Sequence, residues 1–86
     1  MIREYRTLML TLYVRTGCQY CAHVLAVADE LHIPLTLKNV DDEGVTDELI
    51  RIGGKKQEPF LVDDERETML YESDVIELYL RERVAH

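Results

Sequence analysis

Two cysteines, Cys18 and Cys21, are the residues of this chain whose type and spacing best suit chemistry. Gln19 and Tyr20 separate them, which makes a C-x-x-C motif. Such a pair in a reducing compartment is typical of thiol redox chemistry or of metal binding. The chain has no further cysteine, and two are too few for the disulfide framework of a small secreted domain. The motif is therefore the first candidate for a functional site.

The position of the motif favours redox chemistry. An apolar strand is predicted before it and an amphipathic helix after it, so Cys18 opens the helix, where unpaired backbone N–H groups face its sulfur. A helix N-terminus with a nearby cation lowers the pKa of a cysteine thiol from about 8.5 to roughly 3.5–7.5, and Arg15 precedes Cys18 closely. Cys21 follows one turn later on the same side, within disulfide reach but deeper and less acidic. We therefore predict that Cys18 attacks and that Cys21 resolves.

Metal binding is the main alternative for the cysteine pair. A zinc site needs about four ligands, commonly from two paired motifs, whereas this chain has one C-x-x-C and three histidines. On the predicted helix, His23 points away from Cys21, and His32 lies at the far end. We expect no metal site within one chain, while an iron–sulfur cluster bridged between two chains remains an alternative.

The elements that position the motif form a β-α-β unit. Residues 8–14 are almost continuously apolar, which predicts a strand covered on both faces. Residues 18–32 carry apolar side chains at helical spacing, and a proline follows them. In residues 35–40, Leu35 and Leu37 alternate with polar residues, which predicts a half-buried strand.

The rest of the chain predicts two more helices and a hairpin. The acidic run of residues 41–43 predicts a capped helix start, and a Gly-Gly pair ends that helix. Two short apolar runs, residues 60–62 and 69–71, flank a polar stretch and predict a hairpin. Ser73 is the predicted cap of the final helix. The expected core faces of the two helices are Val45, Leu49 and Ile52, and Ile76, Leu80 and Val84, with Val75 and Tyr79 alongside.

The order of elements, β-α-β-α-β-β-α, predicts an α/β fold. Its four strands would form a mixed sheet with helices on both faces, and the crossover of the first β-α-β unit should be right-handed. At 86 residues the chain is expected to form one domain over residues 1–86, in which residues 1–7 are a short N-terminal extension.

Composition and charge exclude several classes of function. The net charge of −7 argues against nucleic-acid binding, which depends on many Lys and Arg contacts to phosphate, and against anionic membrane surfaces. No apolar run approaches the roughly 18 residues of a membrane span, and the start of the chain lacks the apolar core of a secretory signal. We therefore expect a cytoplasmic monomer without nucleic-acid or membrane partners.

From about Met9 to Leu80 the sequence resembles the glutaredoxin family, above all in the stretch Tyr-Val-Arg-Thr-Gly-Cys-Gln-Tyr-Cys that begins at Tyr13. Its second half, with Pro59-Phe-Leu-Val-Asp and Tyr71-Glu-Ser-Asp, is similar to the N-terminal glutathione-binding domain of glutathione transferases. The resemblance implies a thioredoxin-like fold and the reduction of protein disulfides or glutathione mixed disulfides. Glutathione would be the cosubstrate, and glutathionylated or disulfide-containing proteins would be the partners.

Position by position, the resemblance also implies contacts to glutathione. Arg15 matches a cation that pairs with the glycine carboxylate. Lys55, Lys56 and Gln57 lie where the family has further carboxylate contacts, and the resemblance leaves open which of the three serves. Pro59 matches a cis-proline, and the backbone of Glu58 would pair with the cysteinyl part of the ligand.

At the other end of the ligand, Glu72, Ser73 and Asp74 match the loop and helix start that hold the γ-glutamyl group. A helix N-terminus suits the carboxylate of that group, and Asp74 suits its ammonium. Tyr20 is expected to contact the substrate at the rim of the site, and Tyr13 to be a packing residue.

Two residues depart from the family pattern. Gln19 replaces a proline between the cysteines, which restores an N–H donor and loosens the turn. Glu58 replaces an apolar residue before the cis-proline. A carboxylate beside the sulfur would raise the thiol pKa and repel anionic glutathione, whereas a side chain directed into solvent would leave the backbone pairing unchanged.

The sequence thus favours a glutathione-dependent thiol–disulfide oxidoreductase with Cys18 as nucleophile. One alternative is a redox carrier that thioredoxin reductase recharges without a glutathione site. Another is a module that binds glutathione or an iron–sulfur cluster shared between chains.

Overall fold

The chain folds in the predicted order β-α-β-α-β-β-α. A computed structural model describes residues 10–85, so the predicted extension of residues 1–7 lies outside the described residues. The elements are β1 (Leu10–Val14), α1 (Gln19–Glu30), β2 (Thr36–Asn39), α2 (Val45–Gly53), β3 (Phe60–Asp63), β4 (Thr68–Leu70) and α3 (Ser73–Ala85). Among residues 10–85, every helix is too short or too polar to cross a membrane.

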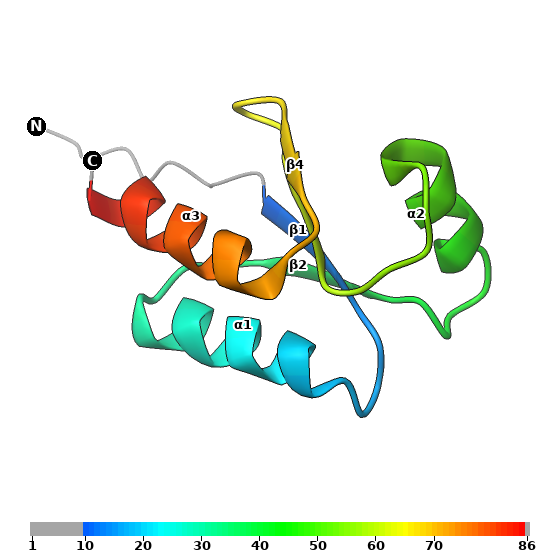
Figure 1. Cartoon of the computed structure of the whole chain (residues 1–86), viewed down its shortest axis with the longest axis horizontal. Helices are drawn as coiled ribbons and strands as arrows, with labels where there is room; N and C mark the ends of the chain where they lie inside the picture. Colours follow the sequence, from blue (N-terminus) through cyan, green and yellow to red (C-terminus); the bar gives the residue numbers. More distant parts are fainter. Residues whose placement is uncertain (1–9, 86) are drawn as a thin grey trace, which may run out of the picture.

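The strands form the predicted mixed sheet, in the spatial order β2-β1-β3-β4. β1 runs parallel to β2 and antiparallel to β3, and β3 and β4 form the antiparallel hairpin. Helices α1 and α3 pack against each other on one face of the sheet, and α2 lies apart from them on the other side (Figure 1). Because β1 is central and covered on both faces, its sequence is almost continuously apolar.

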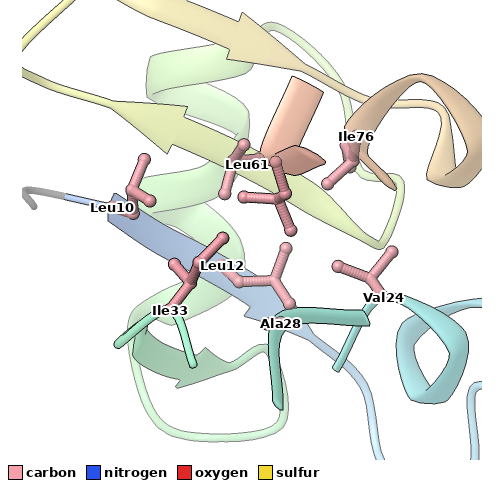
Figure 2. Close-up of a cluster of buried hydrophobic side chains, with 8 residues drawn as sticks. Leu10, Leu12, Val24, Ala28, Ile33, Leu61 and Ile76 are labelled. Carbon is pink, nitrogen blue, oxygen red and sulfur yellow. The ribbon is translucent and has the colours of Figure 1, made fainter. Parts of the chain in front are cut away.

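Side chains of β1 alternate between two hydrophobic clusters, one on each face of the sheet. Leu10 and Leu12 point toward α1 and α3, and Tyr13 points toward α2. In Figure 2, side chains from β1, β3 and the two helices converge on the first cluster. Its buried members are Leu10, Leu12, Val24, Ala28, Ile33, Leu61, Ile76 and Leu80.

The second cluster fastens α2 to the sheet through Tyr13, Val40, Leu49 and Phe60. Tyr13 is buried, as predicted for a packing residue, and its hydroxyl donates a hydrogen bond to Glu48 on α2. Burial and the Glu48 carboxylate raise the pKa of this tyrosine, so its hydroxyl stays protonated as a donor.

Four hydrophobic residues predicted to face the core or to flank its helical face are exposed, namely Leu37, Ile52, Val75 and Val84. Val75 lies beside the core face of α3, next to the buried Ile76. Leu37 is 51% exposed because β2 is an edge strand with a neighbour on one side only. Ile52 and Val84 lie in the last turns of α2 and α3, beyond the buried Leu49 and Leu80. A sequence pattern gives the face of a helix but not how far the neighbouring elements extend along it.

Both predicted caps are corrected by the structure. α2 begins after Gly44, which has a φ of +83° and makes no side-chain cap bond, so residues 41–43 precede the helix instead of capping it. Ser73 is the first helical residue of α3, because the N–H of Ile76 already bonds to the carbonyl of Glu72 at 2.8 Å. The cap position of α3 therefore belongs to Glu72.

A buried carboxylate fixes α3 to the hairpin. Asp63, at the end of β3, is fully buried and accepts hydrogen bonds from the hydroxyl of Tyr79 at 2.5 Å and from Nε of Arg83 at 2.8 Å. It also accepts from the backbone N–H groups of Glu65 and Arg66 in the turn. Burial alone would raise the pKa of Asp63, but these hydrogen bonds outweigh burial and lower it. Because Tyr79 and Arg83 belong to α3 and Asp63 ends β3, these bonds fix the position of α3, including its first turn, relative to the hairpin.

Candidate functional site

The turn between β1 and α1 presents Cys18. The N–H of Cys18 bonds to the carbonyl of Arg15 at 3.1 Å, and Gly17 adopts a φ of +83° inside this turn. That left-handed conformation is open to glycine at little cost. Cys18 itself is extended, with φ −83° and ψ 114°, and is the N-cap of α1. The strand and the turn thereby place its side chain over the start of the helix.

The sulfur of Cys18 takes the role that a capping oxygen plays in other helices. The backbone N–H of Cys21 donates a hydrogen bond to Cys18 Sγ across 3.1 Å. The helix start adds a positive partial charge beside this sulfur. Both cysteines are free, and Cys18 is 7% exposed.

Cys21 lies deeper than Cys18, the arrangement predicted from their helical spacing. It is 2% exposed. Burial, the hydrogen bond with Cys18 and the negative charge of Glu58 raise the pKa of the Cys21 thiol to about 11. Cys21 is therefore protonated near neutral pH, which suits a thiol that acts second.

A cavity of about 570 Å³ is formed by α1, the segment before β3, and the segment that leads into α3. Apart from Tyr71, every residue that lines it is in the set that the resemblance implied. The lining residues are Tyr20, Gln57, Glu58, Pro59, Tyr71, Glu72, Ser73 and Asp74. Segments distant in sequence thus meet at one site.

The wall before β3 contains a cis peptide bond between Glu58 and Pro59, as the resemblance implied. Tyr20, between the two cysteines, is 59% exposed and lines the same cavity. Residues of the cysteine motif and of the cis-proline segment therefore share one surface, where a bound ligand can contact both.

The Glu58 side chain does not point into solvent. It is 6% exposed, and its carboxylate contacts Arg15 Nε at 3.4 Å and Lys56 Nζ at 2.9 Å. Arg15 and Lys56, which were predicted to bind the ligand carboxylate, thus lie close together, but both pair with the carboxylate of Glu58. The sequence predicted that a carboxylate beside the sulfur would raise a thiol pKa. In the structure, the negative charge of Glu58 helps to raise the pKa of Cys21.

The opposite wall is the start of α3. Glu72 and Asp74 are exposed there, and Ser73 is half-buried between them. Asp74 Oδ1 accepts a hydrogen bond from the N–H of Val75 at 2.9 Å. Free N–H groups at a helix start attract a carboxylate, and two acidic side chains attract an ammonium group, so this wall suits a ligand end that carries both.

A family model of the glutathione S-transferase N-terminal domain matches residues 12–86, which is most of the chain. This chain belongs to that family. No curated protein sequence matches it. Membership agrees with the thioredoxin-like fold and with the resemblance in the second half of the sequence.

Solved structures of longer proteins contain the same fold as this glutathione S-transferase N-terminal domain. A glutathione S-transferase from the Antarctic clam Laternula elliptica has a TM-score of 0.74 at 26% identity, over 87% of this chain and 35% of that one. A delta-class glutathione transferase from Nilaparvata lugens has a TM-score of 0.72 at 30% identity, over 85% and 35%.

Glutaredoxin 2 from Salmonella typhimurium, solved in complex with glutathione, has a TM-score of 0.70 at 28% identity, over 85% of this chain and 33% of that one. The domain thus spans about a third of the length of these three proteins. Its neighbours include both transferases and a glutaredoxin, the two families that the sequence resembles.

Tyr71 is a site residue of this domain that sequence reasoning missed. It stacks on Phe60 at 4.3 Å between ring centroids, and its hydroxyl donates to the carbonyl of Lys55 at 2.9 Å. A Cβ on Gly53 would lie 2.0 Å from that hydroxyl oxygen, so a glycine is required there. The Gly-Gly pair, interpreted only as a helix end, was the available signal that another residue approaches closely.

Residues 10–85 of the domain contain no cluster of three or more His, Cys, Asp or Glu side chains that could hold a metal ion.

Proposed function

We propose that this domain is a glutathione-dependent thiol–disulfide oxidoreductase, with Cys18 as nucleophile and Cys21 as resolving thiol. One observation carries the proposal. The Cys18 sulfur lies at the start of α1 and receives the N–H of Cys21 at 3.1 Å. Tyr20, two residues later in the motif, lines a cavity whose far wall suits a zwitterionic ligand.

In the proposed reaction, the Cys18 thiolate attacks one sulfur of a glutathione mixed disulfide. The S–S bond breaks, the partner leaves as a thiolate that takes a proton from water, and Cys18 is left joined to glutathione. A second glutathione thiolate then attacks the glutathione sulfur, which releases Cys18 and oxidised glutathione. On a protein disulfide, the attack leaves Cys18 joined to one protein sulfur and releases the other as a thiolate. Cys21 then loses its proton and attacks the Cys18 sulfur, which breaks that mixed disulfide, releases the second protein thiolate and closes the Cys18–Cys21 bond. Two glutathione molecules reduce this bond to two thiols and leave as oxidised glutathione.

The pKa of Cys21, raised to about 11, favours the route through a second glutathione near neutral pH. Only the thiolate attacks a disulfide, and Cys21 is almost entirely protonated there. Closure of the Cys18–Cys21 bond is thus the slower alternative when glutathione is abundant.

Glutathione would lie along the cavity, with its cysteinyl part beside the backbone of Glu58 and its γ-glutamyl end at the start of α3. There its ammonium group would meet Glu72 and Asp74, and its carboxylate the free N–H groups of the helix. The likeness to glutaredoxin 2, which was solved with glutathione, supports this placement.

A glutathione-coupled assay with a small mixed disulfide tests the proposal on the wild type, Cys18→Ser and Cys21→Ser. We expect Cys18→Ser to lose turnover and Cys21→Ser to retain deglutathionylation. Equal loss in both variants would contradict the division of labour between the thiols, and activity in Cys18→Ser would overturn the proposal. Replacing glutathione by thioredoxin reductase in the same assay tests the carrier alternative.

Family membership favours a second candidate, glutathione conjugation or simple glutathione binding without redox turnover. Conjugation of glutathione to 1-chloro-2,4-dinitrobenzene, measured on the same variants, distinguishes the two. Turnover with this electrophile but none with the mixed disulfide would favour the transferase. A coloured protein after anaerobic purification would favour the bridged iron–sulfur cluster.

We also propose that the protein acts as a monomer in the cytosol, on glutathionylated or disulfide-containing proteins. A single C-x-x-C pair without further cysteines is typical of a protein in a reducing compartment. Light scattering that gives the mass of one 10.1 kDa chain would support the monomer, and a dimer mass would contradict it.

A further inference from the structure

The charges around the cavity are distributed unevenly. The charged residues that line it are Glu58, Glu72 and Asp74, and all three are acidic. Arg15 and Lys56, the cations on the Cys18 side, both contact the carboxylate of Glu58. Their positive charges are therefore partly neutralised before any ligand arrives.

Glu58 is fixed in this position from several sides. Its side chain is 6% exposed, whereas the side chains of Arg15 and Lys56 are 48% and 45% exposed. Its backbone is joined to Pro59 in the cavity wall. The carboxylate can leave the two cations only by breaking both ion pairs.

A ligand carboxylate that approached Arg15 and Lys56 would meet this resident carboxylate. It would have to displace Glu58 or share the cations with it, and either arrangement costs free energy through lost ion pairs or like-charge repulsion. A neutral group at the same place incurs neither cost. The three side chains therefore disfavour a ligand carboxylate, relative to a neutral ligand group, near Arg15 and Lys56.

We propose that Glu58 is a specificity-determining residue that occupies the Arg15–Lys56 pair as an internal carboxylate. The inference rests on the proposed function and narrows its substrate class. Glutathione still binds, but the carboxylate at its glycine end adds no affinity, so γ-glutamyl thiols and disulfides in which that carboxylate is masked bind at least as well. The acidic wall at α3 still receives the ammonium group at the other end.

The test compares two unreactive ligands, S-methylglutathione and the same molecule with its glycine carboxylate converted to a primary amide. Their dissociation constants are measured by calorimetry on the reduced protein. Three forms are compared, namely the wild type, Glu58→Gln and Glu43→Gln. Glu43 is exposed ahead of α2, outside the cavity lining, so its replacement controls for the loss of one negative charge.

We expect the wild type and Glu43→Gln to bind the two ligands within about threefold of each other, or to prefer the amide. Glu58→Gln keeps the shape of the side chain and releases both cations, so it should prefer the free acid by about tenfold or more. Adding Arg15→Gln to Glu58→Gln should reduce that preference, because one of the released cations is then missing.

A wild type that already prefers the free acid tenfold would overturn the inference, as would an unchanged preference in Glu58→Gln. If Glu43→Gln gained the same preference for the free acid as Glu58→Gln, the effect would come from net charge, and the inference would also be overturned. These results leave the glutathione site of the proposed function standing, because ligand still binds. If no form binds either ligand, the glutathione site itself is refuted, and the inference with it.

Discussion

The backbone N–H of Cys21 donates a hydrogen bond to the sulfur of Cys18 across 3.1 Å. The bond makes Cys18 Sγ the acceptor at the helix start, whereas the Cys21 side chain is buried one turn further along and its thiol pKa is raised to about 11. The same turn of helix that brings the thiols together therefore also makes them chemically unequal.

Alkylation of Cys21 should be slow near neutral pH. In Cys18→Ser, where Cys21 is the only thiol, burial still holds the pKa of Cys21 above its ordinary value, so little of this thiol is ionised near neutral pH. We expect iodoacetamide to react with it at pH 7 more than about tenfold slower than with free cysteine, whose pKa is about 8.5. The rate should rise as the pH is raised into the alkaline range.

Cys21→Ser is the matched control, because it leaves Cys18 as the only thiol at the helix start. Its alkylation at pH 7 should be faster than that of Cys18→Ser. If Cys21 reacted as fast as free cysteine at pH 7, the assignment of the buried, protonated thiol would be wrong.

Gly53→Ala should destabilise the fold by about 1–3 kcal/mol, because the new methyl group would overlap the hydroxyl of Tyr71 and the ring of Phe60. Urea unfolding measures the loss. Tyr71→Phe removes the nearest atom, so the double variant should lose less than the sum of the two single variants. Gly54→Ala is the control, since nothing lies within 4 Å of its Cβ position and only its φ of +93° opposes a side chain. If the stability loss of the double variant equalled the sum of the two single losses, the Tyr71 hydroxyl would not be what excludes a side chain at residue 53.

Arg83→Met should cost about 3–5 kcal/mol in the free energy of unfolding, because it leaves the buried carboxylate of Asp63 without its cation. Arg81→Met is the matched control, since Arg81 makes only an exposed pair with Glu30 at 3.5 Å and should cost at most about 1 kcal/mol. Chemical denaturation of both variants checks the difference. Equal losses would mean that the Asp63 network does not secure α3.

Stability should fall in acid through Asp63. Its folded pKa lies below the ordinary value, so its contribution is complete above about pH 4 and is lost as the pH falls from there through the folded pKa. Unfolding free energies measured between pH 6 and pH 2 should therefore decline more steeply for the wild type than for Asp63→Asn. If the unfolding free energies of the two proteins declined in parallel with pH, Asp63 would not be the cause of the loss of stability in acid.

Much of the fold follows from local sequence patterns. The apolar run of β1, the helical spacing after Cys18 and the paired apolar runs of the hairpin each depend on neighbours close in sequence. The exposure of Leu37 and Val84 does not, because it depends on where the sheet and the facing helix end. For the same reason, the pattern placed Gly53 at a helix end without showing that Tyr71 packs against it.

The candidate site divides in the same way. The sequence by itself determined the C-x-x-C motif, its place at a strand-to-helix junction, and therefore the order in which the two thiols act in the proposed chemistry. Only the tertiary structure decided that Glu58 lies buried between Arg15 and Lys56. Ion pairs form between side chains that the fold brings within a few ångströms, and residues 15 and 58 meet only because β1 and β3 are neighbours in the sheet.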